Sequence, residues 1–163
     1  MFRSGSFVAE HLDEVEPGQV QPNGVDLRVE AILEPSEPGR IRTDGKRIGK
    51  REPRPEVPLG GDIDRPGYHL DPGGYVLQYA ETVRIPLEHV GFILPRSSLM
   101  RNGAMLNTAV WDAGYEGKGE GLLQVHHEIE IETGARVGQL VLASADHEGV
   151  YEGSYQGERL EEV

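Results

Sequence analysis

Residues 73–103, GGYVLQYAETVRIPLEHVGFILPRSSLMRNG, decide the fold that we expect for this chain. The stretches 73–85 and 89–95 are short, apolar and bounded by glycine or proline, which is typical of β-strands. Residues 96–103 then predict a helix of one to two turns that ends at Gly103. The stretch therefore predicts two strands followed by one small helix.

Similar strand patterns recur on both sides of this stretch. In residues 24–33, apolar residues alternate with charged ones, which predicts a half-buried strand. Residues 121–134 and 136–145 are also strand-like, whereas residues 6–15 predict a short helix. The 22 glycines and 11 prolines argue against a helical bundle. We expect an all-β fold, either a barrel or a jelly roll, with one or two short helices.

A chain of 163 residues fits a single domain over residues 1–163. Residues 35–66 are rich in proline, glycine and charge, and we expect an extended surface excursion there with at most a short hairpin. The tail, residues 146–163, has no apolar periodicity and is typical of a mobile segment. We refer to these two regions below as the excursion and the tail.

The composition excludes several classes of protein. The net charge of −12 argues against a nucleic-acid or anionic-lipid partner, and no apolar run is long enough to span a membrane. The absence of cysteine excludes disulfides and the thiolate sites of zinc nucleoside deaminases. The first residues lack the apolar stretch of a signal peptide, so we expect a cytoplasmic protein. Only 3 of the 16 basic residues are lysine, which indicates a halophilic protein.

The short predicted helix carries groups that bind anions. Ser97 and Ser98 lie where a strand ends and a helix begins, and backbone N–H groups are free at such a point. Arg96 and Arg101 offer guanidinium groups that grip phosphate oxygens in pairs. The alternative is an ordinary capping serine with two solvated arginines.

A second candidate stretch is NTAVWDAGYEG, residues 107–117. Asp112 lies there between Trp111 and a turn of small residues. A carboxylate held on a tight loop beside apolar walls can act as a general base toward water. The alternative is an aspartate that only begins a turn, which is one of its commonest roles.

A third stretch is VYEGSYQGE in the tail. Glycine and aromatic residues on a mobile segment can fold over a ligand, with backbone N–H groups on phosphates and a ring over a base or sugar. The alternative is a polar tail without a ligand.

The order of these stretches resembles the dUTPase and dCTP deaminase superfamily. QPNGVDLR, PRSSLMRNG, AVWDAGYEG, GARVGQL and YEGSYQG are similar to five motifs of that superfamily, in the right order. The resemblance is strongest to the archaeal, deaminase-like dUTPases. It implies a distorted jelly-roll β-barrel, a homotrimer with active sites between subunits, Mg²⁺ on the triphosphate of the substrate dUTP, and a tail that closes as a lid.

The resemblance also implies roles for individual residues. Asp112 corresponds to the aspartate that activates water, and Tyr115 to the tyrosine under the deoxyribose. Backbone groups around Asn107, Ala109 and Trp111 would read uracil. The remaining binding residues implied are Arg96, Ser97, Ser98, Arg101 and Gln139 on the phosphates, and Tyr151, Tyr155, Gln156 and Gly157 in the lid. No protein ligand for the metal is implied.

The superfamily contains two chemistries, hydrolysis of dUTP and deamination of dCTP. Deaminases use a glutamate on the strand after the third motif, and the position here is Gln124, whose amide cannot exchange protons in that role. Other placements put Leu122 or Glu120 there, and Glu120 is flanked by two glycines, a poor setting for a rigid catalytic group. We therefore expect a dUTP pyrophosphatase. The alternatives are a dCTP deaminase, alone or bifunctional, that uses Glu120, and a barrel that binds a deoxynucleotide without turnover.

Overall fold

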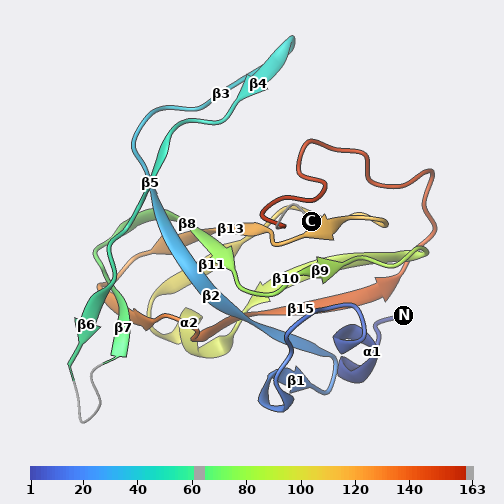
Figure 1. Cartoon of the computed structure of the whole chain (residues 1–163), viewed down its shortest axis with the longest axis horizontal. Helices are drawn as coiled ribbons and strands as arrows, with labels where there is room; N and C mark the ends of the chain where they lie inside the picture. Colours follow the sequence, from blue (N-terminus) through green and yellow to red (C-terminus); the bar gives the residue numbers. More distant parts are fainter. Residues whose placement is uncertain (61–64, 161–163) are drawn as a thin grey trace.

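The computed structural model describes residues 1–60 and 65–160 and shows an antiparallel barrel-like sheet (Figure 1). Neighbouring strands follow one another in the order β10, β15, β2, β8, β13 and β11. These strands span His89–Pro95, Arg136–Ser144, Gly24–Pro35, Gly73–Tyr79, Glu120–Val125 and Ala104–Asn107, respectively. The all-β jelly-roll fold expected from the sequence is confirmed.

Shorter elements complete the molecule. Strands β1 (Val20–Gln21) and β5 (Arg51–Pro53) pair with β2, and β12 (Glu116–Gly117) pairs with β9 (Val83–Arg84). A three-stranded sheet joins β14 (Ile129–Glu132), β7 (Arg65–Leu70) and β6 (Val57–Leu59), and β3 (Arg40–Arg42) forms a hairpin with β4 (Gly45–Arg47). The helices are α1 (Gly5–Ala9), the 3-10 turn η1 (Pro17–Gln19) and α2 (Ser97–Arg101). No helix among residues 1–60 and 65–160 is long and apolar enough to cross a membrane.

The core lies inside the barrel and follows the alternation seen in the sequence. Along β2, the side chains of Val25, Leu27 and Val29 are buried, as the pattern predicts. Leu123 of β13 and Leu140 of β15 are fully buried against them. The opposite faces of these strands remain available for polar side chains.

Strand β10 and helix α2 lie where the sequence predicts them. Helix α2 ends at Arg101, and Gly103 follows with a φ of +77°, a conformation that glycine adopts without steric cost. The predicted helix over residues 6–15 is too long. Helix α1 covers only Gly5–Ala9, with the Ser4 hydroxyl accepting a hydrogen bond from the Phe7 N–H, because the chain then turns to pair Leu12 with Val83.

Two predicted strands are each divided. The stretch 73–85 breaks between β8 and β9, where the carboxylate of Glu81 is fully buried. The carboxylate accepts hydrogen bonds from Gln19 and from the Arg28 side chain and backbone, at 2.7 to 3.0 Å, so the chain turns inward there. The stretch 121–134 breaks at an exposed bend between β13 and β14.

The excursion holds more structure than the one hairpin expected from its composition. The β3–β4 hairpin projects away from the barrel in Figure 1, and residues 35–48 are all exposed. However, β5 pairs with β2 and β6 pairs with β7, so the base of the excursion extends the sheets. Sequence composition did not reveal this because richness in proline, glycine and charge does not show which short segments will pair with neighbouring strands. Residues 61–64 of the excursion and 161–163 of the tail lie outside the described residues.

Candidate functional site

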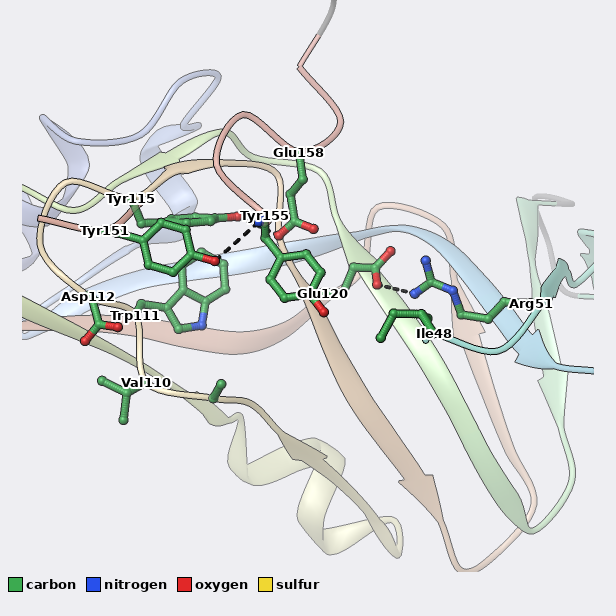
Figure 2. Close-up of a pocket in the computed structure, with 11 residues that line it drawn as sticks. Ile48, Arg51, Val110, Trp111, Asp112, Tyr115, Glu120, Tyr151, Tyr155 and Glu158 are labelled. Atoms are coloured by element: carbon green, nitrogen blue, oxygen red, sulfur yellow. Dashed lines mark hydrogen bonds and ion pairs between the residues drawn. The ribbon is translucent and has the colours of Figure 1, made fainter. Parts of the chain in front are cut away.

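A pocket of about 540 Å³ opens on the loop that joins β11 to β12. Figure 2 shows that four parts of the chain meet around it: this loop, the start of β13, the tail, and the base of the excursion. The lining residues are Ile48, Arg51, Ala109, Val110, Trp111, Asp112, Tyr115, Glu120, Tyr151, Tyr155 and Glu158.

Asp112 lies at one end of this pocket on a rigid loop. The preceding residue, Trp111, forms a two-way backbone bridge with Gly91 of β10, with N–O distances of 2.9 and 3.1 Å. The backbone carbonyl of Asp112 accepts a hydrogen bond from the Tyr115 N–H at 3.2 Å, and Gly114 has a φ of +84° in this turn. The Asp112 carboxylate is exposed and has no hydrogen-bonding partner among the described residues, so it is free to hold a water molecule.

Aromatic rings form the wall next to Asp112. The ring centroids of Trp111 and Tyr115 lie 4.9 Å apart in an edge-to-face arrangement, and Tyr115 meets Tyr151 in the same way at 5.5 Å. Such contacts fix the ring orientations and add to the stability of the wall. The wall gives a guest molecule flat apolar surfaces against which a base or sugar can pack.

The tail covers this wall through specific hydrogen bonds. The Tyr115 hydroxyl donates to Glu158 at 2.8 Å, and burial, followed by the contact with Glu158, raises the pKa of Tyr115. Burial also raises the pKa of Glu158, although the hydrogen bond from Tyr115 opposes that shift. Arg159 anchors the end of the tail by an ion pair with Glu30 at 2.5 Å. Tyr115 therefore lies in the pocket with its hydroxyl already bound by the tail.

The four lid residues named from the sequence fall into two groups. Tyr151 and Tyr155 line the pocket. Gln156 instead holds the tail to the loop, donating to the carbonyl of Gly114 at 3.0 Å, and the Gly157 N–H donates to the Glu116 carbonyl at 2.8 Å. These contacts dock the tail beside the loop that carries Asp112.

Glu120 lies at the other end of the pocket and is firmly held. As the first residue of β13 it stands opposite Gln78 of β8, whose amide donates to one carboxylate oxygen at 2.7 Å. The Arg51 guanidinium forms an ion pair with the other oxygen. The expectation that the flanking glycines leave Glu120 without a rigid setting is therefore wrong, because strand pairing and two donors fix its side chain.

The two other positions considered for this carboxylate lie outside the pocket. Gln124 accepts a hydrogen bond from the Asn107 amide at 2.7 Å, and Leu122 faces a neighbouring depression of about 320 Å³. That depression also includes Asn107, and Ala109 and Glu120 border both hollows. Of the three positions, only that of Glu120 places a carboxylate in the pocket that contains Asp112.

Ile48, Arg51 and Glu158 belong to the pocket but did not emerge from the sequence. Arg51 reaches it because β5 pairs with the end of β2, and Glu158 because the tail docks on the loop. Both depend on contacts between distant parts of the chain. The only sequence signal was the high density of basic residues in the excursion, from Arg40 to Arg54.

A second cluster of charged residues lies where β10 ends and α2 begins. The buried carboxylate of Asp26 forms ion pairs with Arg96 at 3.1 Å and Arg136 at 3.4 Å. Burial raises the pKa of Asp26, and the two guanidinium groups oppose this shift. Gln139 pairs with Asp26 across β15 and β2. The other expected phosphate-binding residues, Ser97, Ser98 and Arg101, are exposed on α2 nearby.

Within one chain, this charged cluster lies away from Asp112. Trp111, next to Asp112, bridges to Gly91, whereas Arg96 follows the end of β10 five residues later. At about 3.3 Å per residue, the two points are roughly 17 Å apart along the strand. A carboxylate that activates water must lie within hydrogen-bond reach of that water. The charged cluster and the pocket are therefore two separate halves of the expected site.

The sequence profile of the dCTP deaminase-like family matches residues 3–145. A relative from Halobacterium salinarum, named probable deoxyuridine 5'-triphosphate nucleotidohydrolase, is 59% identical over 99% of this chain and 97% of its own length. The deoxyuridine 5'-triphosphate nucleotidohydrolase of Methanocaldococcus jannaschii is 39% identical, with 89% of this chain and 92% of that protein covered.

Solved structures share the fold at low sequence identity. The crystal structure of a 2'-deoxycytidine 5'-triphosphate deaminase from Agrobacterium tumefaciens superimposes with a TM-score of 0.60 and 19% identity over 88% of this chain. The match covers 48% of that deaminase, so this chain spans about half its length. A dUTPase variant of Staphylococcus bacteriophage 80alpha superimposes with a TM-score of 0.51 and 15% identity, over 88% of this chain and 95% of the phage chain. Both likenesses concern the fold alone.

Proposed function

The chain belongs to the dCTP deaminase-like family, and we propose that it hydrolyses dUTP to dUMP and diphosphate. The observation that carries this proposal is the free carboxylate of Asp112 at the end of an aromatic pocket. The names of relatives that match almost the whole chain support the same reaction.

The pocket has the chemistry to bind the nucleoside part of dUTP. Asp112, Glu120 and Glu158 contribute three carboxylates to its lining, and Arg51 contributes one positive charge. A triphosphate would be repelled by such a lining, whereas an uncharged base and sugar would not. Trp111 and Tyr115 offer the flat surfaces, and Tyr115 would lie under the deoxyribose and exclude a ribose 2'-hydroxyl.

Asp112 performs the chemical step in this proposal. Its carboxylate orients a water molecule and accepts a proton from it while the water oxygen attacks the α-phosphorus. The new bond joins that oxygen to phosphorus, and the bond from phosphorus to the oxygen bridging the α- and β-phosphates breaks. The products are dUMP and diphosphate, and Asp112 then releases its proton to solvent.

The phosphate-binding half of the site would come from a second copy of the chain. Arg96, Ser97, Ser98 and Arg101 carry the donors for the phosphates, but Arg96, the first of them, lies roughly 17 Å along β10 from the bridge beside Asp112. Gln139 lies in the same cluster. A homotrimer in which each site takes Asp112 from one subunit and Arg96 from another satisfies both requirements.

The residues present fit a divalent metal that arrives with the nucleotide. No group of three or more His, Asp or Glu side chains suited to a metal gathers among the described residues. We propose Mg²⁺ held mainly by the phosphate oxygens, where it would neutralise charge on the leaving diphosphate. The chain itself supplies the base, the aromatic wall and the cationic side chains.

Deamination of dCTP is the second candidate because Glu120 places a carboxylate in the pocket. Hydrolysis is favoured over it because both oxygens of Glu120 already accept hydrogen bonds, from Gln78 and Arg51. A deaminating glutamate must instead take and return protons at the base.

One pair of incubations tests the proposal. The purified protein is incubated with Mg²⁺ and either dUTP or dCTP in a high-salt buffer, and anion-exchange chromatography separates the products. We expect dUTP to give dUMP and dCTP to remain unchanged. Formation of dUTP or dUMP from dCTP would assign deamination to Glu120, and the absence of any product would leave only nucleotide binding.

A further inference from the structure

We infer that Arg51 determines specificity in this pocket by binding the pyrimidine base and favouring uracil over cytosine. This inference rests on the proposed function, since it concerns the base of dUTP. Arg51 belongs to the excursion, which matches none of the five motifs that carry the family resemblance.

Arg51 is held in place by a chain of contacts across two strands. Gln78 of β8 donates to Glu120 of β13 at 2.7 Å, and Glu120 in turn forms the ion pair with Arg51. The side chains of Arg51 and Glu120 are 30% and 20% exposed, so the pair is half-buried at the pocket surface. A guanidinium fixed in this way keeps a defined orientation toward a guest molecule.

Arg51 has donors left over for such a guest. A guanidinium carries five N–H groups in a planar fork, and one terminal nitrogen of Arg51 contacts Glu120. Among the described residues, its side chain has no second hydrogen-bonding partner, and it lines the pocket. The remaining N–H groups therefore need an acceptor that a ligand can supply.

The position of Arg51 suits the base rather than the phosphates. Asp112 and the pair of Arg51 with Glu120 occupy opposite ends of the pocket, and the aromatic wall lies between them (Figure 2). If Asp112 faces the α-phosphate, as proposed, the sugar packs on the wall and the base extends toward Arg51. Ile48, also from the excursion, lines the same end and offers an apolar contact to the ring.

The hydrogen-bonding pattern of uracil matches this pair of side chains. Uracil has an oxygen acceptor at position 4 and an N–H donor at position 3, whereas cytosine has an amino donor and a bare nitrogen there. Each oxygen of Glu120 keeps a second lone pair beside its hydrogen bond from Gln78 or Arg51, so it can accept a further bond without taking up a proton. With the guanidinium at position 4 and this carboxylate at position 3, uracil forms both bonds. In the same orientation, cytosine places donor against donor and acceptor against acceptor. Arg51 thus recognises the base through its side chain, in addition to the recognition of uracil by backbone groups that is expected from residues 107–111.

The test compares Arg51→Gln with Arg54→Gln. Arg54 is a matched control because it lies in the same segment, forms an ion pair with Glu34 at 3.1 Å, is 31% exposed, and does not line the pocket. The measurement is kcat/KM for dUTP together with the inhibition constant of dCTP as a competitor. We expect Arg51→Gln to reduce the preference for dUTP roughly ten- to hundredfold, the effect of losing a hydrogen bond from a charged group. Arg54→Gln should leave the preference unchanged.

A second measurement needs no variant. A deoxynucleoside triphosphate with a 4-thiouracil base, which keeps the N–H at position 3 but has a weaker sulfur acceptor at position 4, should bind the unaltered protein severalfold more weakly than dUTP. An unchanged preference in Arg51→Gln, or equal binding of this analogue and dUTP, would overturn the role of Arg51 while hydrolysis by the unaltered protein still stands. Failure of the unaltered protein to hydrolyse dUTP would instead overturn the proposed function, and this inference with it.

Discussion

The pocket of Asp112 and the charged cluster around Asp26 differ in nearly every physical property. In the pocket, Asp112 is exposed, has no hydrogen-bonding partner among the described residues and lies beside the aromatic wall, and carboxylates outnumber the single arginine. In the cluster, Asp26 is buried and two arginines neutralise it. The first region is built to place a reactive carboxylate beside an uncharged group, and the second to present positive charge.

Under the proposed function, this difference means that neither region is a complete site by itself. A pocket with three carboxylates and one arginine is a poor setting for a triphosphate, and a carboxylate paired with two arginines is poorly placed to activate water. The barrel keeps them apart, because β10 runs between the Trp111 bridge and helix α2. In the proposed function, the two regions therefore complement each other between copies of the chain.

The largest effect expected concerns the reactive carboxylate of the pocket. Asp112→Asn keeps the shape of the side chain but removes its capacity to accept a proton. We expect kcat for dUTP to fall roughly 10²- to 10⁴-fold, the usual contribution of a general base, while dUTP still binds. Steady-state kinetics measure the first quantity and calorimetric titration with dUTP the second. A variant with wild-type kcat would show that the water is activated elsewhere.

The next prediction tests whether the two regions combine between subunits. Asp112→Asn and Arg96→Ala should each have little activity as pure proteins. If each site takes Asp112 and Arg96 from different subunits, a mixed assembly made by co-expression regains about a quarter of the wild-type activity, since half of the copies are intact at each position. A mixture no more active than its parents would place both residues of each site in one chain. The Arg54→Gln protein mixed with Asp112→Asn serves as the control for assembly.

The sequence predicted well those features of the two regions that are formed by residues close together in the chain. Strand β10 and helix α2 emerged with nearly correct bounds because proline and glycine mark their ends. Asp112, Trp111 and Tyr115 lie on one short loop, so a single motif contains them. The split of residues 73–85 did not emerge, because it depends on the buried contact of Glu81 with Arg28.

The non-local parts of the pocket could not be predicted in the same way. Arg51, Glu120 and Glu158 come from the excursion, from β13 and from the tail, and only the folded barrel brings them together. Glu120 illustrates the reason most clearly. Its glycine neighbours suggested a loose side chain, but the register of β13 with β8 places Gln78 opposite it. The composition of a segment does not report which distant strand will pair with it.

The smallest effect expected concerns the tail that covers the pocket. Burial raises the pKa of Glu158 above its ordinary value near 4.5, so the docked tail favours the protonated carboxyl group. A group whose pKa is raised on docking stabilises the docked state at low pH, and this stabilisation is lost as the pH rises through the raised pKa. Docking of the tail should therefore be tightest below about pH 4.5 and weaken toward neutral pH.

Glu158→Gln removes this dependence, because an amide does not titrate while it still accepts the hydrogen bond from the Tyr115 hydroxyl. Hydrogen exchange of the tail amides, corrected for the intrinsic effect of pH, measures docking directly. The protection of these amides should fall as the pH rises in the unaltered protein and stay level in Glu158→Gln. Equal pH dependence in both would assign the effect to other groups that face Glu158, namely Glu120, Arg159 and Arg51. Because the ion pair of Arg159 with Glu30 also holds the tail, the tail should loosen without detaching.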